Sequence, residues 1–190
     1  MKFSQREVGD LLFAWLMISI AFAILFLDYD TLNLYSISRS FLLSFFVVGT
    51  AFFLHELGHK FIAQRYGYYA EFRAFKGMLY LAVLMSFFGF IFVAPGGVLI
   101  KGRITLKKNG IISLAGPLIN IILGFLFFVL FLMFKSEFFH FSFIINSFIG
   151  LFNLIPVMPF DGGKIFAWNK RVYLLIAVLA LIVFGLRFLT

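Results

Sequence analysis

Residues 41–62 read FLLSFFVVGTAFFLHELGHKFI, an apolar stretch long enough to cross a bilayer that nevertheless carries two histidines and a glutamate. Burying such groups in hydrocarbon costs several kcal/mol unless something compensates for it. On a helix, His55 and His59 are four positions apart and lie on one face, where both can bind a zinc ion. Glu56 beside them can act on a water at that ion. The stretch therefore predicts a metal-binding membrane helix. The alternative is a purely structural role, in which the two histidines form hydrogen bonds between helices.

Composition places the chain in a membrane. Of its 190 residues, 63% are hydrophobic and 13% are charged, and the mean hydropathy is +1.08, which leaves too little polar surface for a water-soluble domain. Spans of about 20 residues use nearly all of the length. We therefore expect residues 1–190 to form a single integral-membrane domain. Because the chain has no cysteine, the strong metal ligands that it offers are His, Asp and Glu.

Six apolar runs and the charges around them predict the topology. The runs cover residues 11–27, 41–62, 78–95, 111–134, 141–159 and 172–189. Basic segments flank the third run on both sides, and the positive-inside rule keeps both segments in the cytoplasm. The sequence Ala94-Pro95-Gly96-Gly97 at its end favours a reversal of the chain. We therefore expect an all-α polytopic membrane protein with five full transmembrane helices and a re-entrant or sixth apolar segment at about 78–97.

The basic residues also predict an orientation. On the five-crossing topology, 13 of the 16 lysines and arginines face the cytoplasm. We expect a multi-pass protein of the cell membrane whose N-terminus and active-site end are cytoplasmic. The chain has a net charge of +8, but its basic residues lie beside apolar runs and do not form one patch, so we expect no nucleic-acid partner.

A catalytic zinc site normally has three protein ligands, so the two histidines need a third. Of the eight acidic residues, six lie in predicted leaders or loops, which leaves Glu56 and Asp161 at apolar segments. Asp161 ends the segment NLIPVMPFD (153–161), where two prolines unwind the helix and the two glycines that follow allow an abrupt turn. Asp161 is therefore the predicted third ligand.

These motifs resemble those of the site-2 protease family of intramembrane zinc metalloproteases, in a compact form without PDZ or CBS domains. The family pairs an HExxH helix with a downstream Asn-x-x-Pro-x-x-Pro-x-Asp-Gly segment, and the chain has both, at 55–59 and 153–162. A Gly-Pro-x-x-Asn element between them is matched by GPLIN (116–120). The apolar insert at 78–97 departs from the family, whose members often carry membrane-associated strands there.

The resemblance implies one zinc ion per chain, held by His55, His59 and Asp161, with Glu56 as the catalytic base. The implied activity is that of an intramembrane zinc metalloendopeptidase, a hydrolase that cuts a peptide bond within or near a transmembrane segment in regulated intramembrane proteolysis. The expected partners are a transmembrane protein substrate and the lipid bilayer. The alternative is a non-hydrolytic membrane protein that binds or transports a divalent metal, which would have little use for Glu56.

Five further residues have predicted roles, and two of them, both asparagines, have two possible roles. Asn120 and Asn153 are amides at membrane depth, and each can donate a hydrogen bond to the substrate or the developing oxyanion, or can bond between helices. Gly116 and Pro117 are expected to open a helix and allow close packing. His140 is expected to be an ordinary interfacial residue.

Overall fold

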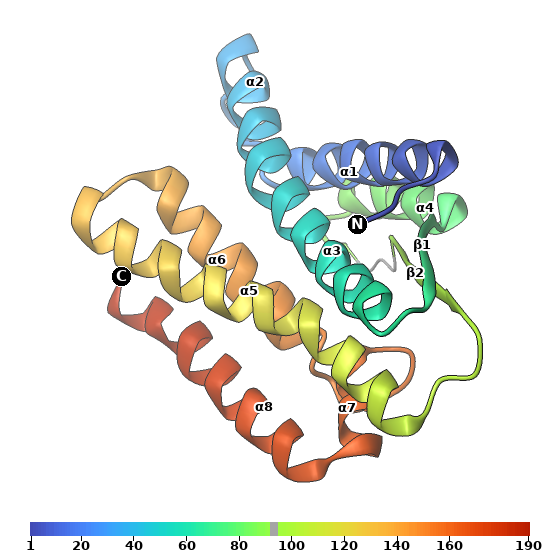
Figure 1. Ribbon diagram of the computed structural model, residues 1–190. Coiled ribbons are helices and arrows are strands. Elements are labelled where there is room, and N and C mark those ends of the chain that lie inside the picture. Colours follow the sequence, from blue (N-terminus) through green and yellow to red (C-terminus); the bar gives the residue numbers. More distant parts are fainter. Residues whose placement is uncertain (92–94) are drawn as a thin grey trace. The chain divides into compact units, whose positions relative to one another are not determined.

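The computed structural model describes residues 1–91 and 95–190, most of which are helical. In chain order (Figure 1), the elements are α1 (Gln5–Leu25), α2 (Leu34–Leu43), the π-helix η1 (Ser44–Gly49), α3 (Thr50–Arg65), β1 (Tyr69–Ala74), α4 (Lys76–Ser86), β2 (Gly96–Lys101), α5 (Leu106–Phe134), α6 (Glu137–Phe152), α7 (Asp161–Trp168), α8 (Lys170–Gly185) and the 3-10 helix η2 (Leu186–Leu189). Within the described residues, four helical segments are long and apolar enough to cross a membrane: Gln5–Leu25, Leu34–Arg65, Leu106–Phe134 and Lys170–Leu189.

These elements pack into two compact units. The first, called the site unit below, contains residues 1, 54–70 and 100–190; the second unit contains residues 2–53 and 71–99. All of the predicted metal-site residues belong to the site unit. The expectation that residues 1–190 act as a single membrane domain stays a prediction.

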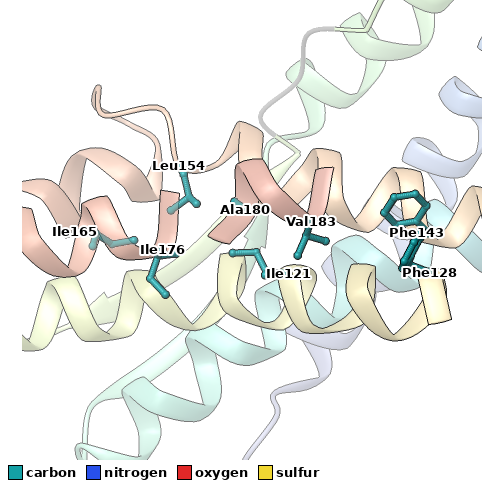
Figure 2. Packing of buried hydrophobic residues seen from close by; sticks show 8 residues of the cluster. All are labelled: Ile121, Phe128, Phe143, Leu154, Ile165, Ile176, Ala180 and Val183. Atoms are coloured by element: carbon teal, nitrogen blue, oxygen red, sulfur yellow. The ribbon is translucent and has the colours of Figure 1, made fainter. Parts of the chain in front are cut away.

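The core of the site unit lies among α5, α6, α7 and α8 (Figure 2). Its buried members are Ile121, Phe128, Phe143, Leu154, Ile165, Ile176, Ala180 and Val183. Ile165 is fully buried and comes from α7, whose first residue is Asp161. Because α7 has only eight residues, this tertiary packing stabilises it far more than helix propensity does. The apolar core therefore holds the predicted third ligand in place.

The Gly-Pro pair of α5 does not open a helix. α5 begins at Leu106, after the N-cap Thr105, whose side chain accepts a hydrogen bond from the Lys108 amide at 3.3 Å. Pro117 lies well inside the helix and is buried. The expectation that Gly116 and Pro117 start a helix is therefore wrong, and its cause is that membrane helices tolerate an internal proline that a water-exposed helix would not.

In the second unit, α1 begins earlier than its apolar run, because Ser4 caps it by accepting a hydrogen bond from the Glu7 amide at 3.1 Å. The Glu7 side chain is fully buried and accepts from the amide of Phe72 in β1 at 2.9 Å. Asp10 lies 3.5 Å from Arg73, also in β1. The first ten residues are thus not the simple polar leader that hydropathy suggests, since two of their acidic groups bond to β1.

The long helical segment Leu34–Arg65 contains the π-helix η1. The indole Nε1 of Trp15 in α1 donates to the carbonyl oxygen of Phe45 at 2.9 Å. π-helical turns are rare and occur mostly as single turns inside α-helices, as here. Sequence periodicity alone gave no sign of this irregular turn.

A two-stranded sheet of β1 and β2 corrects the all-α prediction. The sequence YAEFRA of β1 alternates larger polar or charged residues with Ala70 and Phe72, both of which are buried. Such alternation is the signal of a half-buried strand. The strands lie on either side of the apolar insert, so this region differs less from the family that the motifs resemble than the sequence suggests.

The third apolar run forms a helix too short to cross a bilayer. α4 has 11 residues, which span about 16 Å, whereas the hydrocarbon core is about 30 Å thick. Gly96 and Gly97 belong to β2, and Ala94 of the predicted reversal lies outside the described residues. The count of five crossings stays a prediction.

Candidate metal centre

Three buried ligand atoms converge in the site unit. α3 supplies His55 and His59, and the first turn of α7 supplies Asp161; the three side chains each offer one ligand atom, and these atoms lie within 4.8 Å of one another. The Oδ2 atom of Asp161 is 3.3 Å from Nε2 of His55 and 3.0 Å from Nε2 of His59. The residues are only 4–7% exposed. The three predicted ligands thus come together although more than 100 residues separate the aspartate from the histidines.

Hydrogen bonds at the far side of each ring fix its tautomer. Nδ1 of His59 lies 2.8 Å from the carbonyl oxygen of Ile112, and Nδ1 of His55 lies 2.5 Å from Oδ1 of Asn120. A backbone carbonyl only accepts hydrogen bonds, so the proton of a neutral His59 ring belongs on Nδ1. Its Nε2 then carries a lone pair directed at Asp161.

This arrangement fits a metal ion. In the neutral ring, the Nε2 lone pair of His59 and the carboxylate oxygen are both acceptors 3.0 Å apart, and a metal ion between them would satisfy both. Ligand atoms bound tetrahedrally to zinc at about 2.0–2.1 Å lie roughly 3.3 Å apart. The observed separations of 3.0 and 3.3 Å are close to that value. The His-His-Asp group is therefore positioned to bind a metal ion.

Two glycines let α3 and α5 approach at the centre. A Cβ atom added at Gly58 would lie 2.5 Å from Cδ1 of Ile119 in α5. One added at Gly116 would lie 2.5 Å from Nε2 of His59 and 2.6 Å from Nε2 of His55. Real Cβ atoms do not come so close, so the missing side chain of Gly116 leaves the space that the two imidazoles occupy.

The turn before α7 aims the carboxylate. The Gly162 amide donates to the carbonyl oxygen of Asn153 at 2.7 Å, and a Cβ atom at Gly162 would overlap the carbonyl of Leu154. Lys164, one turn later, donates from Nζ to Oδ1 of Asp161 at 3.1 Å. The lysine thereby engages one carboxylate oxygen, and the other faces the imidazoles.

Glu56 lies beside the three candidate ligands without joining them. Its carboxylate is 8% exposed and interacts electrostatically with His59, His55 and Asp161. Its Oε2 is one of the few buried side-chain atoms in the described part of the chain that has no hydrogen-bond partner. A buried acceptor left open in this way suits a group that must take up a proton from a bound molecule.

The other predicted polar residues have different surroundings. Asn120 is fully buried and bonds to His55 through Oδ1 and to Asn146 through Nδ2. Asn153 is half-buried and donates from Nδ2 to the carbonyl oxygen of Ile149 at 3.0 Å. Nε2 of His140 lies 3.2 Å from Oγ1 of Thr190. Among the described residues, the group that could bind a metal ion consists of His55, His59 and Asp161 and does not include His140.

Sequence reasoning missed three contacts at the centre: that of Gly116, expected to allow close packing, with the imidazoles, that of Lys164 with the carboxylate, and that of Asn146 with Asn120. The contact of Lys164 could have been predicted, because Lys164 follows Asp161 by three positions, a spacing that brings side chains together on a helix. The other two contacts depend on how α5 packs against α3 and α6, which no local pattern reveals.

Comparison with known proteins agrees with this centre. Residues 43–137 match the model of peptidase family M50. A Methanocaldococcus jannaschii protein named "Putative zinc metalloprotease MJ0611" is 39% identical over 184 residues, which cover 93% of this chain and 92% of that protein. A second protein of that organism, named "Zinc metalloprotease MJ0392", is 32% identical over 122 residues, or 59% of this chain and 30% of its own length. No solved structure matches the chain. The chain therefore belongs to peptidase family M50, the site-2 protease family of zinc metalloproteases.

Proposed function

We propose that the chain is an intramembrane zinc metalloendopeptidase that hydrolyses a peptide bond within or near a transmembrane segment of another membrane protein. The observation that carries the proposal is the convergence of His55, His59 and Asp161 within 4.8 Å. Two of these residues lie on the Leu34–Arg65 segment, which is long and apolar enough to span a bilayer. A hydrolytic centre on such a helix points to a substrate that reaches it from the membrane.

In this proposal, His55, His59 and Asp161 hold one zinc ion, and Glu56 is the general base. Bound zinc supplies Lewis acidity, which makes water more acidic and polarises a carbonyl group. Glu56 takes one proton from the attacking water while the remaining oxygen bonds to the peptide carbon. Glu56 then delivers the proton to the leaving nitrogen as the carbon–nitrogen bond breaks. Its carboxylate ends the cycle unchanged, and the products are a carboxylic acid and an amine.

The two asparagines take different roles in the proposal. The Nδ2 group of Asn120 donates to Asn146, so we assign Asn120 to the support of His55. Asn153 directly precedes the turn to Asp161 and is half-buried, whereas Asn120 is fully buried. Asn153 is therefore the better donor for the substrate backbone or the oxyanion.

The substrate must unwind before it is cut. A transmembrane helix pairs all of its backbone groups internally, so its carbonyl groups are out of reach until it opens locally. Helix-breaking residues near the cleaved bond should therefore favour cleavage. The partners in this proposal are a transmembrane protein and the lipid bilayer, with no nucleic acid.

We further propose that residues 1–190 act as one integral-membrane protease domain of the cell membrane, with the N-terminus and the active-site end in the cytoplasm. The five crossings are α1, the Leu34–Arg65 segment, α5, the apolar run 141–159, whose helical part lies in the 16-residue α6, and α8; the segment at about 78–97 is re-entrant. The shortness of α4 and the excess of basic residues on the predicted cytoplasmic side support this topology.

The proposal predicts that Glu56→Gln abolishes cleavage without loss of zinc. Purified wild-type protein and this variant would be incubated with a panel of single-span substrates, with and without a chelator. We expect the variant to cut at least about a hundredfold more slowly, because general-base catalysis contributes that much. Its zinc content, measured by atomic absorption, should match that of the wild type.

Glu137→Gln is the matched control, because it makes the same chemical change at an exposed position at the start of α6 and should cut normally. Equal cleavage by the wild type and Glu56→Gln would remove Glu56 as the base. Absence of cleavage in every arm, together with metal uptake by the protein in liposomes, would favour the alternative of a metal transporter.

A further inference from the structure

We propose that Asn146 on α6 is a positioning residue that sets the tautomer of the metal ligand His55 by orienting Asn120. The inference deepens the proposed function and rests on it, because it concerns the same metal site. No motif in the sequence points to Asn146. The residue is 2% exposed and lies on the buried side of α6, where an amide is costly to bury unless it is bonded.

Three hydrogen bonds join α6 to the metal ligand. Asn146 Nδ2 donates to the carbonyl oxygen of Ser142 at 2.9 Å, and its Oδ1 accepts from Nδ2 of Asn120 at 3.0 Å. Oδ1 of Asn120 then lies 2.5 Å from Nδ1 of His55. We call these three bonds the amide relay.

The relay has a fixed direction because it ends on the main chain. The Ser142 carbonyl only accepts, so Asn146 must turn its NH2 group toward Ser142 and its oxygen toward Asn120. Asn120 must then turn its NH2 group toward Asn146 and its oxygen toward His55. That oxygen also only accepts, so the ring proton of His55 belongs on Nδ1. The lone pair of His55 is thereby left on Nε2, which faces Asp161 at 3.3 Å.

The packing of α5 against α6 is tight enough for the relay to form. A Cβ atom at Gly150 would lie 3.3 Å from Cβ of Asn120, and one at Gly124 would lie 3.1 Å from the amide of Ser147. These glycines let the helix backbones approach, as small residues do in membrane proteins. Asn146 is held at bonding distance as a result.

Without Asn146, nothing in the relay would tie the Asn120 amide to the Ser142 carbonyl. If that amide turned over, its NH2 group would face Nδ1 of His55 and the ring proton would move to Nε2, where it would block metal binding. Groups that bond the outer nitrogen of a metal-bound histidine typically change metal affinity by about 10- to 100-fold when they are replaced.

The test measures zinc affinity in the purified, metal-stripped protein by competition with a fluorescent zinc chelator. Asn146→Leu should weaken zinc binding by about tenfold or more. Adding Asn120→Asp to it should restore the affinity to within about threefold of the wild type, because a carboxylate accepts in either orientation and holds the His55 proton on Nδ1. A packing role for Asn146 would not give this rescue, since a second buried substitution would add to the damage.

Ser147→Ala is the matched control. Ser147 is the next residue on α6, is 1% exposed, and donates its hydroxyl to the carbonyl oxygen of Ile144 at 3.0 Å. Its removal costs a buried hydrogen bond on α6 but touches no relay member, so zinc affinity should not change. If Asn146→Leu does not fold, Asn146→Ser replaces it, because the serine side chain is too short to reach Asn120.

The outcomes separate this inference from the proposed function. Wild-type zinc binding that His55→Ala does not weaken would overturn the proposed site itself. Zinc binding that is lost in His55→Ala but unchanged in the Asn146 variants would overturn the relay alone. A further loss of affinity on adding Asn120→Asp would also overturn it.

Discussion

At the scale of single residues, Gly116 is where a small change should matter most. The replacement Gly116→Ala would place a methyl group 2.5–2.6 Å from Nε2 of both His55 and His59, so at least one ring must move. We expect zinc affinity to fall by about tenfold or more. Alanine is the better helix former by about 0.5–1 kcal/mol, so the stability of the metal-free protein should hold up better than its zinc binding.

The measurement is chelator competition for zinc affinity together with thermal unfolding of the metal-free protein. Gly9→Ala serves as control, because Gly9 also lies inside a helix and nothing is within 4 Å of a Cβ atom there. Unchanged zinc affinity in Gly116→Ala would show that the rings do not need the space that the glycine leaves.

The sequence was sufficient to predict that three side chains, those of His55, His59 and Asp161, come together. His55 and His59 are one helical turn apart, and Asp161 is set apart from the other acidic residues by the prolines and glycines around it. The role of Gly116 could not be predicted in the same way. Its contact with the imidazoles depends on which side of α5 faces α3, and this is decided by packing between helices far apart in the sequence.

At the scale of elements, long apolar helices were predictable and short amphipathic strands were not. The helical segments Leu34–Arg65 and Leu106–Phe134 include the apolar runs 41–62 and 111–134 and extend beyond them through polar caps and flanks. β1 is only six residues long, and the charges of Glu71 and Arg73 hid its alternation from a reading based on hydropathy.

The short helix α7 gives a prediction at this scale. Gly162 is its second residue, and a Cβ atom there would overlap the Leu154 carbonyl. Gly162→Ala should therefore shift the start of α7, move Asp161 away from the histidines and weaken zinc binding by at least tenfold or so. Gly77→Ala is the matched control, because Gly77 is the second residue of α4 and nothing lies within 4 Å of its Cβ position.

The zinc affinity of both variants is measured by chelator competition, and their helix content is followed by circular dichroism. Wild-type affinity in Gly162→Ala would mean that the turn does not aim the carboxylate.

At the scale of the whole molecule, the charges that predicted the orientation are not all surface charges. Lys60 is one of the 13 basic residues predicted to face the cytoplasm, but it is 1% exposed and donates from Nζ to the carbonyl oxygen of Ala70 at 3.1 Å. Lys107 and Lys135, at either end of α5, are exposed. With its 29 residues α5 spans about 43 Å, more than the hydrocarbon thickness. These two lysines are therefore the informative positions for orientation.

A labelling experiment uses the absence of cysteine from the chain. Single variants Lys107→Cys and Lys135→Cys would be treated with a membrane-impermeant maleimide in intact cells. On the proposed topology, only Lys135→Cys is labelled from outside, and Lys107→Cys is labelled after the cells are opened. The reverse pattern would place the active-site end outside the cell, and labelling of both in intact cells would mean that α5 does not cross.

The two imidazoles are anchored in different ways, and this difference has a consequence for protein engineering. Nδ1 of His59 is anchored on a main-chain oxygen at Ile112, which every amino acid supplies, whereas Nδ1 of His55 is anchored on the side chain of Asn120. To change the preference of the centre among cobalt, zinc and cadmium, a designer could therefore alter the hydrogen bond to His55 by mutation, whereas the hydrogen bond to His59 would persist. Libraries of variants at positions 120 and 146 would change the surroundings of His55 and leave the main-chain bond to His59 intact.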